Sequence, residues 1–250
     1  MTDIIGTDTI GATVLGYPRI GPRRELKRAV ERYWAGSLDR AGLRAVEAGL
    51  RRETWIGLRD AGLGSVPGNT FSYYDHVLDT TRMVGAVPAR FTALGLDRLD
   101  TMFAMARGHG GMRPSELTKF FDTNYHYLVP ELGPDTALQV TDCKPVDEFR
   151  EALEVGVRTR PVLLGPMTFL LLAKPAAEAP AGFSTLELLE PLVEVYAQLL
   201  AELGRLGAVW VQFDEPACVA DRTDAELECL AWAYRRLGAV PGRPKMLVAG

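Results

Sequence analysis

The sequence is poor in the residues that build disulfide frameworks and metal sites, and it has no long uninterrupted apolar run. The chain has three cysteines, Cys143, Cys218 and Cys229. An odd number without a C-x-x-C pair is typical of proteins in a reducing compartment. The three histidines are scattered, so residue spacing supports no zinc site within the chain. The longest apolar run, residues 162–173, is broken by glycine and proline and is too short to cross a bilayer.

The chain also lacks the features of secreted and of nucleic-acid-binding proteins. Its first residues have neither the basic region nor the long apolar region of a signal peptide. With 28 basic and 32 acidic residues the formal net charge is -4, and few aromatic residues cluster with basic ones, which argues against nucleic acid. A composition of 47% apolar and 24% charged residues is typical of a globular protein. We therefore predict a soluble cytoplasmic protein with no membrane or nucleic-acid partner.

What the chain does have is a basic helix start. Residues 16–36, GYPRIGPRRELKRAVERYWAG, predict a helix that ends near Trp34. Four basic residues occupy its first turns: Arg23, Arg24, Lys27 and Arg28. A helix N-terminus already carries about +0.5 of a charge, so stability alone favours acidic residues there. Together with free backbone N–H groups, these side chains make a site for carboxylates or phosphates. The alternative is a solvated basic face, partly neutralised by neighbouring glutamates.

A second polar stretch covers residues 115–132, SELTKFFDTNYHYLVPEL. The pattern predicts a short helix, capped by Ser115, that runs into a loop. Hydrogen-bonding side chains are dense in it: Lys119, Asp122, Asn124, Tyr125, His126 and Tyr127. Such a density suits the wall of a cleft. A core-packed segment whose polar tips are satisfied fits the same residues.

From about residue 137 short apolar runs alternate with amphipathic helices. Strands are predicted at 137–141, 160–165, 208–216 and 244–250, with helical periodicity between them. This alternation indicates α/β architecture with a parallel sheet. No G-x-G-x-x-G follows a strand, which favours a (β/α)8 TIM-type barrel over a dinucleotide-binding sheet. We expect a helical elaboration over about 17–130 and β/α repeats over about 137–250. Because we count fewer than eight strands, we also expect a truncated barrel, incomplete at its C-terminal end.

Two adjacent carboxylates, Asp214 and Glu215, follow the predicted strand 208–216. The carboxyl ends of barrel strands are where TIM barrels place their active sites. There the pair can bind a cation or orient a substrate amine. The pair can equally cap the following turn and satisfy backbone N–H groups. Residues 165–169, GPMTF, form a strand-to-helix turn whose N–H groups are expected to face the same mouth.

Five segments together resemble the N-terminal half of cobalamin-independent methionine synthase: LGYPRIGPRRELKRAVERYWAG, YYDHVLDTT, ELTKFFDTNYHYLVPE, RPVLLGPMTFLLL and WVQFDEPA. The resemblance implies methyl transfer from 5-methyltetrahydropteroyltriglutamate to homocysteine, which makes methionine. It also implies two facing barrels. The zinc ligands and the homocysteine pocket belong to the C-terminal barrel of the family, and cobalamin is not used.

The resemblance also implies which residues bind the folate. Those of the RELK motif and of the E-x-T-K segment are Arg24, Glu25, Leu26, Lys27 and Lys119. Further candidates are Arg23, Asn124, Asp214 and Glu215. A triglutamate tail carries several carboxylates, and a basic helix start complements it. Each charge-assisted hydrogen bond contributes about 1.5–3 kcal/mol, so a few of them favour the triglutamate over the monoglutamate.

The departure from the family pattern is the absence of the C-terminal barrel with its zinc ligands. The resemblance therefore implies no catalytic residue and no metal ligand in this chain, with zinc and homocysteine bound by the missing barrel. We expect the chain alone to be inactive in methyl transfer. Two alternatives stay open: a non-catalytic anion- or folate-binding scaffold module, and an independent TIM-barrel enzyme of the uroporphyrinogen decarboxylase type.

Overall fold

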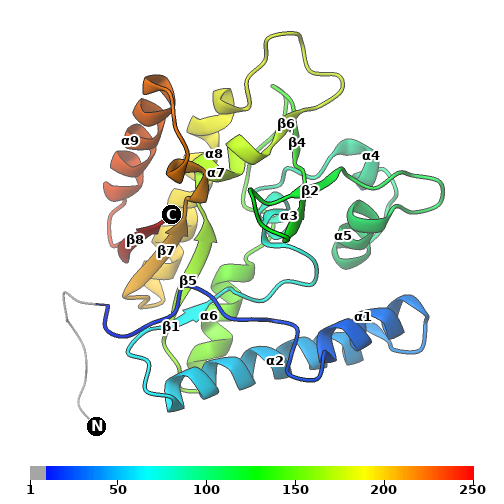
Figure 1. Ribbon diagram of the computed structural model, residues 1–250, viewed down its shortest axis with the longest axis vertical. Coiled ribbons are helices and arrows are strands. Elements are labelled where there is room, and N and C mark those ends of the chain that lie inside the picture. Colours follow the sequence, from blue (N-terminus) through cyan, green and yellow to red (C-terminus); the bar gives the residue numbers. More distant parts are fainter. Residues whose placement is uncertain (1–9) are drawn as a thin grey trace.

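A four-stranded parallel sheet lies at the centre of the computed structural model, which describes residues 10–250 (Figure 1). Its strands are hydrogen-bonded in the order β1-β5-β7-β8, with the bounds Val66–Gly68, Thr159–Leu164, Trp210–Asp214 and Lys245–Ala249. A single parallel bridge between Thr13 and Ser65 joins the opening segment to the residue before β1. The side chains of β5 and β7 are mostly buried, as expected of a parallel sheet covered by helices.

Amphipathic helices surround the sheet, and their starts are set by capping side chains. Asp39, Asp75 and Asp97 each accept a backbone N–H of the first turn of the helix that follows. The helices are α1 (Glu25–Trp34), α2 (Arg40–Asp60), α3 (His76–Met83), α4 (Ala89–Thr92), α5 (Arg98–Arg107), α6 (Lys144–Glu154), α7 (Pro166–Leu172), α8 (Leu189–Arg205) and α9 (Asp224–Gly238), with 3-10 turns η1 (Thr185–Leu188) and η2 (Pro216–Val219). Short strands outside the main sheet are β2 (Leu117–Lys119), β3 (His126–Leu128), β4 (Glu131–Leu132) and β6 (Lys174–Pro175).

The prediction of an α/β chain with a parallel sheet is confirmed by this topology. The strands β5, β7 and β8 and the helices between them lie where the alternating pattern placed them. The closed barrel and the two sequence divisions at about 17–130 and 137–250 remain predictions. Within residues 10–250, no helix is both long enough and apolar enough to cross a membrane.

Two local predictions are wrong. Residues 115–121 do not form a helix: β2 pairs antiparallel with β3, with Lys119 opposite His126. The backbone N–H of Ser115 donates to Met105, so this residue ends a connection and does not cap a helix. Residues 137–141 form no strand either, because their backbone N–H groups donate to the carbonyls of Val84 and Met83 at the end of α3. Local sequence does not reveal such tertiary partners.

A buried arginine ties the opening segment to the sheet. The Arg160 guanidinium on β5 donates to Gln212 on β7 at 3.0 Å and to the hydroxyls of Thr13 and Ser65 at 2.7 and 2.6 Å. It also donates to the carbonyl of Val14 at 2.9 Å. Burial lowers the pKa of Arg160, and its donors are satisfied by polar oxygens. This arrangement holds residues 13–15 against the sheet and directs the following loop across the carboxyl ends of the strands (Figure 1).

Candidate functional site

The basic helix start is a surface feature of α1. Leu26, Ala29 and Val30 bury one face of the helix, and the four basic side chains lie exposed on the other. Arg24 is the N-cap residue and has φ 62°, in the left-handed region that non-glycine residues seldom occupy. Such strain is more common at functional sites than elsewhere.

The four cations are not equally available. Arg23 Nε donates to Glu25 Oε1 at 2.9 Å, and Lys27 Nζ lies 2.8 Å from Glu31 Oε1. Arg24 and Arg28 make no side-chain hydrogen bond or ion pair with any residue from 10 to 250. The charges that the sequence groups together are therefore two paired and two unpaired side chains.

Glu25 explains how the helix start tolerates this basic cluster. Its carboxylate also accepts the backbone N–H of Arg23 at 2.9 Å, and the hydrogen bond from the Arg23 side chain lowers its pKa. The N–H of Leu26 donates to the carbonyl of Ile20. An acidic side chain thus complements the helix dipole. A ligand carboxylate at this helix start would therefore bind mainly to side-chain donors. Fewer backbone N–H groups are free than the sequence suggested.

Lys119 and Asn124 lie on the hairpin of β2 and β3, away from α1 along the chain. Both side chains are exposed. Neither makes a side-chain hydrogen bond or an ion pair within residues 10–250. The backbone carbonyl of Asn124 faces His126 Nδ1 at 3.0 Å, which orders the turn. No described contact joins this hairpin directly to the RELK residues.

Arg19 links the opening loop to this hairpin. Its Nε donates to the Ser72 carbonyl at 2.9 Å, and its Nη2 donates to the Tyr74 carbonyl and the Tyr125 hydroxyl at 2.5 and 3.1 Å. The Tyr125 hydroxyl lies 3.4 Å from His76 Nδ1, and the two rings are stacked. Burial lowers the pKa of His76 to about 4, and Arg19 adds to the effect. Sequence reasoning singled out neither Arg19 nor His76, although both lie in the segments that carry the family resemblance.

Asp214 and Glu215 have different surroundings. The Glu215 carboxylate is buried, and it accepts the backbone N–H groups of Met167 and Thr168 at 3.2 and 2.7 Å and the Tyr234 hydroxyl at 2.9 Å. The Glu215 carboxylate therefore binds the N–H groups of the turn at residues 165–169, which we expected to face the mouth of the barrel. Asp214 is half-buried and accepts from Gln212 at 2.5 Å, and burial raises its pKa. Of the two carboxylates, Asp214 lines a cavity at the strand ends.

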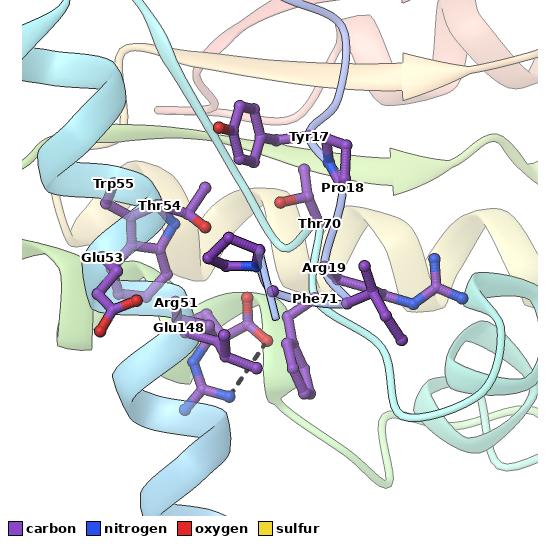
Figure 2. A pocket seen from close by; sticks show the side chains of 14 residues that line it. Tyr17, Pro18, Arg19, Arg51, Glu53, Thr54, Trp55, Thr70, Phe71 and Glu148 are labelled. Atoms are coloured by element: carbon purple, nitrogen blue, oxygen red, sulfur yellow. Dashed lines mark ion pairs between the residues drawn. The ribbon is translucent and has the colours of Figure 1, made fainter. Parts of the chain in front are cut away.

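Three cavities lie beside the opening loop, and the third, between the loop and α1, includes Lys27 in its wall. The first, here called the mouth cavity, has a volume of about 180 Å³ and lies at the carboxyl ends of β1, β5 and β7. The second, the side cavity, has about 330 Å³ and lies between the loop and α2. Figure 2 shows Tyr17 and Thr70 at one end of the side cavity, with Arg51 and Glu148 facing one another at the other. Tyr17 and Arg19 line both the mouth cavity and the side cavity.

A buried charge network lies beneath the cavities, formed by Glu47, Arg51, Asp79, Lys144, Glu148 and Glu151. Lys144 Nζ is 2.9 Å from Glu148 and 3.6 Å from Asp79, and it donates to Asn69 at 2.7 Å. Burial works to lower the Lys144 pKa, but the two carboxylates outweigh it and raise that pKa. Arg51 pairs with Glu151 at 2.6 Å and contacts Glu47. Ion pairs between these charges join α2, α3 and α6.

The cysteines do not fit a zinc site. Cys143 precedes α6, Cys218 lies on η2 and Cys229 lies on α9. Among the residues that the structure describes, no three His, Cys, Asp or Glu side chains are grouped closely enough to hold a metal ion. Partial burial raises the pKa of the Cys218 thiol to about 11, which disfavours the thiolate that zinc binds. No chemical step is therefore assigned to a metal here.

These features define an α/β protein on a parallel sheet, with exposed cations at one helix start and a polar cavity at the strand ends. The model of the family described as cobalamin-independent synthase, N-terminal domain, matches residues 11–250. The chain belongs to this family.

Curated relatives agree with that assignment. A protein of Streptomyces coelicolor is 58% identical over 95% of this chain, and one of Rhodococcus jostii is 54% identical over 97%. A Mycobacterium tuberculosis relative is 51% identical over 100% of the chain. Each is named 5-methyltetrahydropteroyltriglutamate–homocysteine methyltransferase. The match covers 31% or 32% of each relative, so the chain spans about a third of their length.

Solved structures show a similar fold at low sequence identity. A putative vitamin-B12 independent methionine synthase from Listeria monocytogenes matches with a TM-score of 0.58 and 12% identity, over 96% of this chain and 63% of that one. A B12-independent methionine synthase from Shewanella matches with a TM-score of 0.60 and 17% identity, over 85% and 53%. At these identities the likeness concerns the fold alone.

Proposed function

We propose that this chain supplies the folate-polyglutamate-binding part of a methyltransferase. The whole protein would transfer the methyl group of 5-methyltetrahydropteroyltriglutamate to homocysteine in methionine biosynthesis. Membership of the cobalamin-independent synthase family and the names of relatives up to 59% identical support the reaction. We place the protein in the cytoplasm because methionine biosynthesis uses soluble substrates.

The observation that carries the binding role is the state of Arg24. Its side chain is exposed and unpaired within residues 10–250, on a residue held in a left-handed conformation at the start of α1. Arg28 is also exposed and makes no side-chain hydrogen bond or ion pair within residues 10–250. Lys27 can exchange its ion pair with Glu31 for one with a ligand carboxylate. Cations without partners at one helix start complement a tail with several carboxylates.

The remaining candidate residues take lesser parts in this proposal. Lys119 is an exposed cation on the hairpin, suited to one end of an extended tail, and Asn124 offers an amide beside it. Leu26 anchors α1 through its buried side chain, and Glu25 orders the helix start. Glu215 has its carboxylate occupied by three donors, so we propose a structural role for it.

We also infer that the parallel sheet is part of a (β/α)8 barrel. The strands follow one another in chain order, all parallel, and the Thr13–Ser65 bridge extends the series. The similarity to two methionine synthase structures supports this interpretation. By the family resemblance, zinc and homocysteine would be bound by a second barrel, for which residues 10–250 offer no ligand set.

Binding of methyltetrahydrofolate with one or three glutamates tests the tail site. We expect the triglutamate to bind more tightly by isothermal titration calorimetry. Arg24→Glu and Lys27→Glu should each weaken triglutamate binding roughly tenfold to a hundredfold, the loss of one charge-assisted contact. The monoglutamate should lose less.

A matched control is Arg98→Glu, which makes the same charge change on an exposed arginine in the first turn of α5. It should leave both affinities unchanged. Equal binding of the two folates by a folded chain would contradict the tail site. Equal losses of triglutamate affinity in Arg24→Glu and Arg98→Glu would show that the effect depends on net charge and not on a specific site.

A further inference from the structure

The mouth cavity lies where parallel α/β proteins usually place ligands. Its wall includes Asn69 directly after β1, Leu164 at the end of β5 and Asp214 at the end of β7. These are the carboxyl ends of three neighbouring parallel strands, the position of ligand sites in this architecture. None of the residues assigned to the folate tail at the start of α1 lines this cavity.

Two buried polar atoms in this wall have no hydrogen-bond partner. The Ser72 hydroxyl belongs to a residue that is 2% exposed and has no partner within residues 10–250. Asp79 Oδ2 also lacks a hydrogen bond, and its nearest described cation is Lys144 Nζ at 3.6 Å. Leaving such a group unpaired is unfavourable, so a bound molecule that pairs with it is favoured.

Asn69 is held rigidly in the wall of the cavity. It has φ 56°, in the left-handed region, and its side chain is fixed at both ends. Nδ2 donates to the Val162 carbonyl at 2.8 Å, and Oδ1 accepts from Lys144 at 2.7 Å. Non-glycine residues held in such a conformation cluster at ligand sites.

The open groups in the cavity carry both signs of charge. Asp79 and Asp214 offer carboxylate oxygens. Lys144 donates to Asn69 and pairs with Glu148, whereas Arg19 Nη1 makes no hydrogen bond to a described residue. A volume of about 180 Å³ holds about six waters at about 30 Å³ each. Apolar side chains complete the wall, among them Met83, Val162 and Leu164.

From this geometry we propose that the mouth cavity binds a small α-amino acid zwitterion with an apolar side chain. The ammonium group faces the carboxylates of Asp214 and Asp79, and the carboxylate faces Arg19 and the Ser72 hydroxyl. The side chain lies against the apolar wall. This site is separate from the folate-tail site and does not depend on it.

Histidine ring signals in NMR provide a direct test. The chain has three histidines, and only His76 lines the mouth cavity, whereas His109 and His126 are exposed elsewhere. We expect L-norleucine to shift the His76 signals saturably and to leave the other two unchanged. Pentylamine and hexanoate, which each lack one charged group of norleucine, should bind at least tenfold more weakly. A His76 ring unmoved by norleucine, or equal shifts in all three rings, would overturn the proposal and leave a hydrated cavity.

Two conservative variants locate the ligand. Asp214→Asn should weaken norleucine binding about tenfold and Ser72→Ala about threefold, with circular dichroism confirming that each is folded. Their controls are Asp135→Asn and Ser37→Ala, which make the same changes at exposed positions. If one variant fails to fold, the norleucine affinity of the other still tests the site. Unchanged affinity in the folded variants places binding elsewhere and contradicts the site.

The same samples separate this proposal from the folate function. Arg24→Glu should weaken triglutamate binding and leave norleucine binding unchanged, whereas Ser72→Ala should weaken norleucine binding about threefold and leave triglutamate binding unchanged. Loss of both ligands in both variants would show a single shared site and overturn the separation.

Discussion

The molecule uses the same side chains in opposite ways at two places. At the start of α1, Arg24 and Arg28 are exposed and unpaired within residues 10–250. In the buried charge network, Arg51 and Lys144 are surrounded by carboxylates and hydrogen-bonded. Burial of an unpaired charge is costly, so the interior charges must satisfy one another, while the surface charges remain free to bind a ligand.

The comparison shows that a charge pattern in sequence does not decide between binding and structure. Lys144 and Glu148 are four residues apart on α6, as are Lys27 and Glu31 on α1. Both pairs resemble a solvated helix face. What separates them is the ion pairing of α6 with residues of α2 and α3, which no local pattern contains.

Breaking the buried charge network should have the largest effect. Lys144→Met leaves Glu148 and Asp79 buried without their cation, so we expect the free energy of unfolding to fall by about 3–5 kcal/mol. Urea denaturation followed by circular dichroism measures it. Lys174→Met, which breaks an exposed pair with Glu116, should cost at most about 1 kcal/mol. Similar losses of unfolding free energy in Lys144→Met and Lys174→Met would contradict the distinction between buried and exposed charges.

Two neighbouring buried groups should give opposite pH dependences. Burial raises the pKa of Asp75 to about 7, so the folded state keeps a proton that the unfolded state has released. The free energy of unfolding therefore falls as pH rises from about 4 to about 7. Burial lowers the pKa of His76 to about 4, so its contribution rises with pH between about 4 and the unfolded value of 6.5.

The two contributions nearly cancel in the wild type between about pH 4 and 6.5. Asp75→Asn should make stability rise with pH and His76→Gln should make it fall, each by up to about 1.4 kcal/mol per pH unit. Urea titrations across this range measure the slopes. Identical slopes in the two variants would contradict these pKa values.

Arg24→Gly should separate binding from stability at the helix start. Glycine adopts φ 62° without strain, so the free energy of unfolding should stay unchanged or rise by about 0.5–1 kcal/mol. Triglutamate binding should still weaken about tenfold, since the guanidinium is lost. As a comparison, Arg98→Gly on α5 should bring no gain in stability and no loss of affinity. A destabilised Arg24→Gly chain would show that Arg24 has a structural role.

The smallest effect concerns the ion pair that holds Lys27. Glu31→Gln frees this lysine, so we expect triglutamate to bind about twofold to threefold more tightly, with the gain reduced by salt. Stability should change by no more than about 0.5 kcal/mol. Glu194→Gln, which frees exposed Arg236 on α9, is the control. An unchanged affinity would mean that Lys27 does not contact the tail.

Regular periodicity made much of the fold predictable. The helix α1, the strands β5, β7 and β8 and the helices between them follow from apolar spacing and caps. The hairpin of β2 and β3 did not follow, because its short polar strands lack a two-residue alternation of apolar side chains. Its pairing depends on tertiary contacts.

The candidate site divides in the same way. The basic cluster at α1 was visible because its charges are adjacent in sequence. The pairing of Glu215 with the turn at Gly165 was not, since the two are separated by fifty residues of chain. A side chain at Gly165 would meet the Glu215 carboxylate at 2.1 Å, so the close approach itself requires glycine.

Arg160 and Gln212 have a consequence for the order of assembly during synthesis. The contacts from Arg160 to Thr13 and from Gln212 to Leu15 span 147 and 197 residues. A chain emerging from the ribosome therefore exposes its opening segment long before either partner exists. The contact from Gln212 to Leu15 can form only after β7 has left the exit tunnel. Residues 13–15 therefore complete their contacts late, although they precede both partners in the chain.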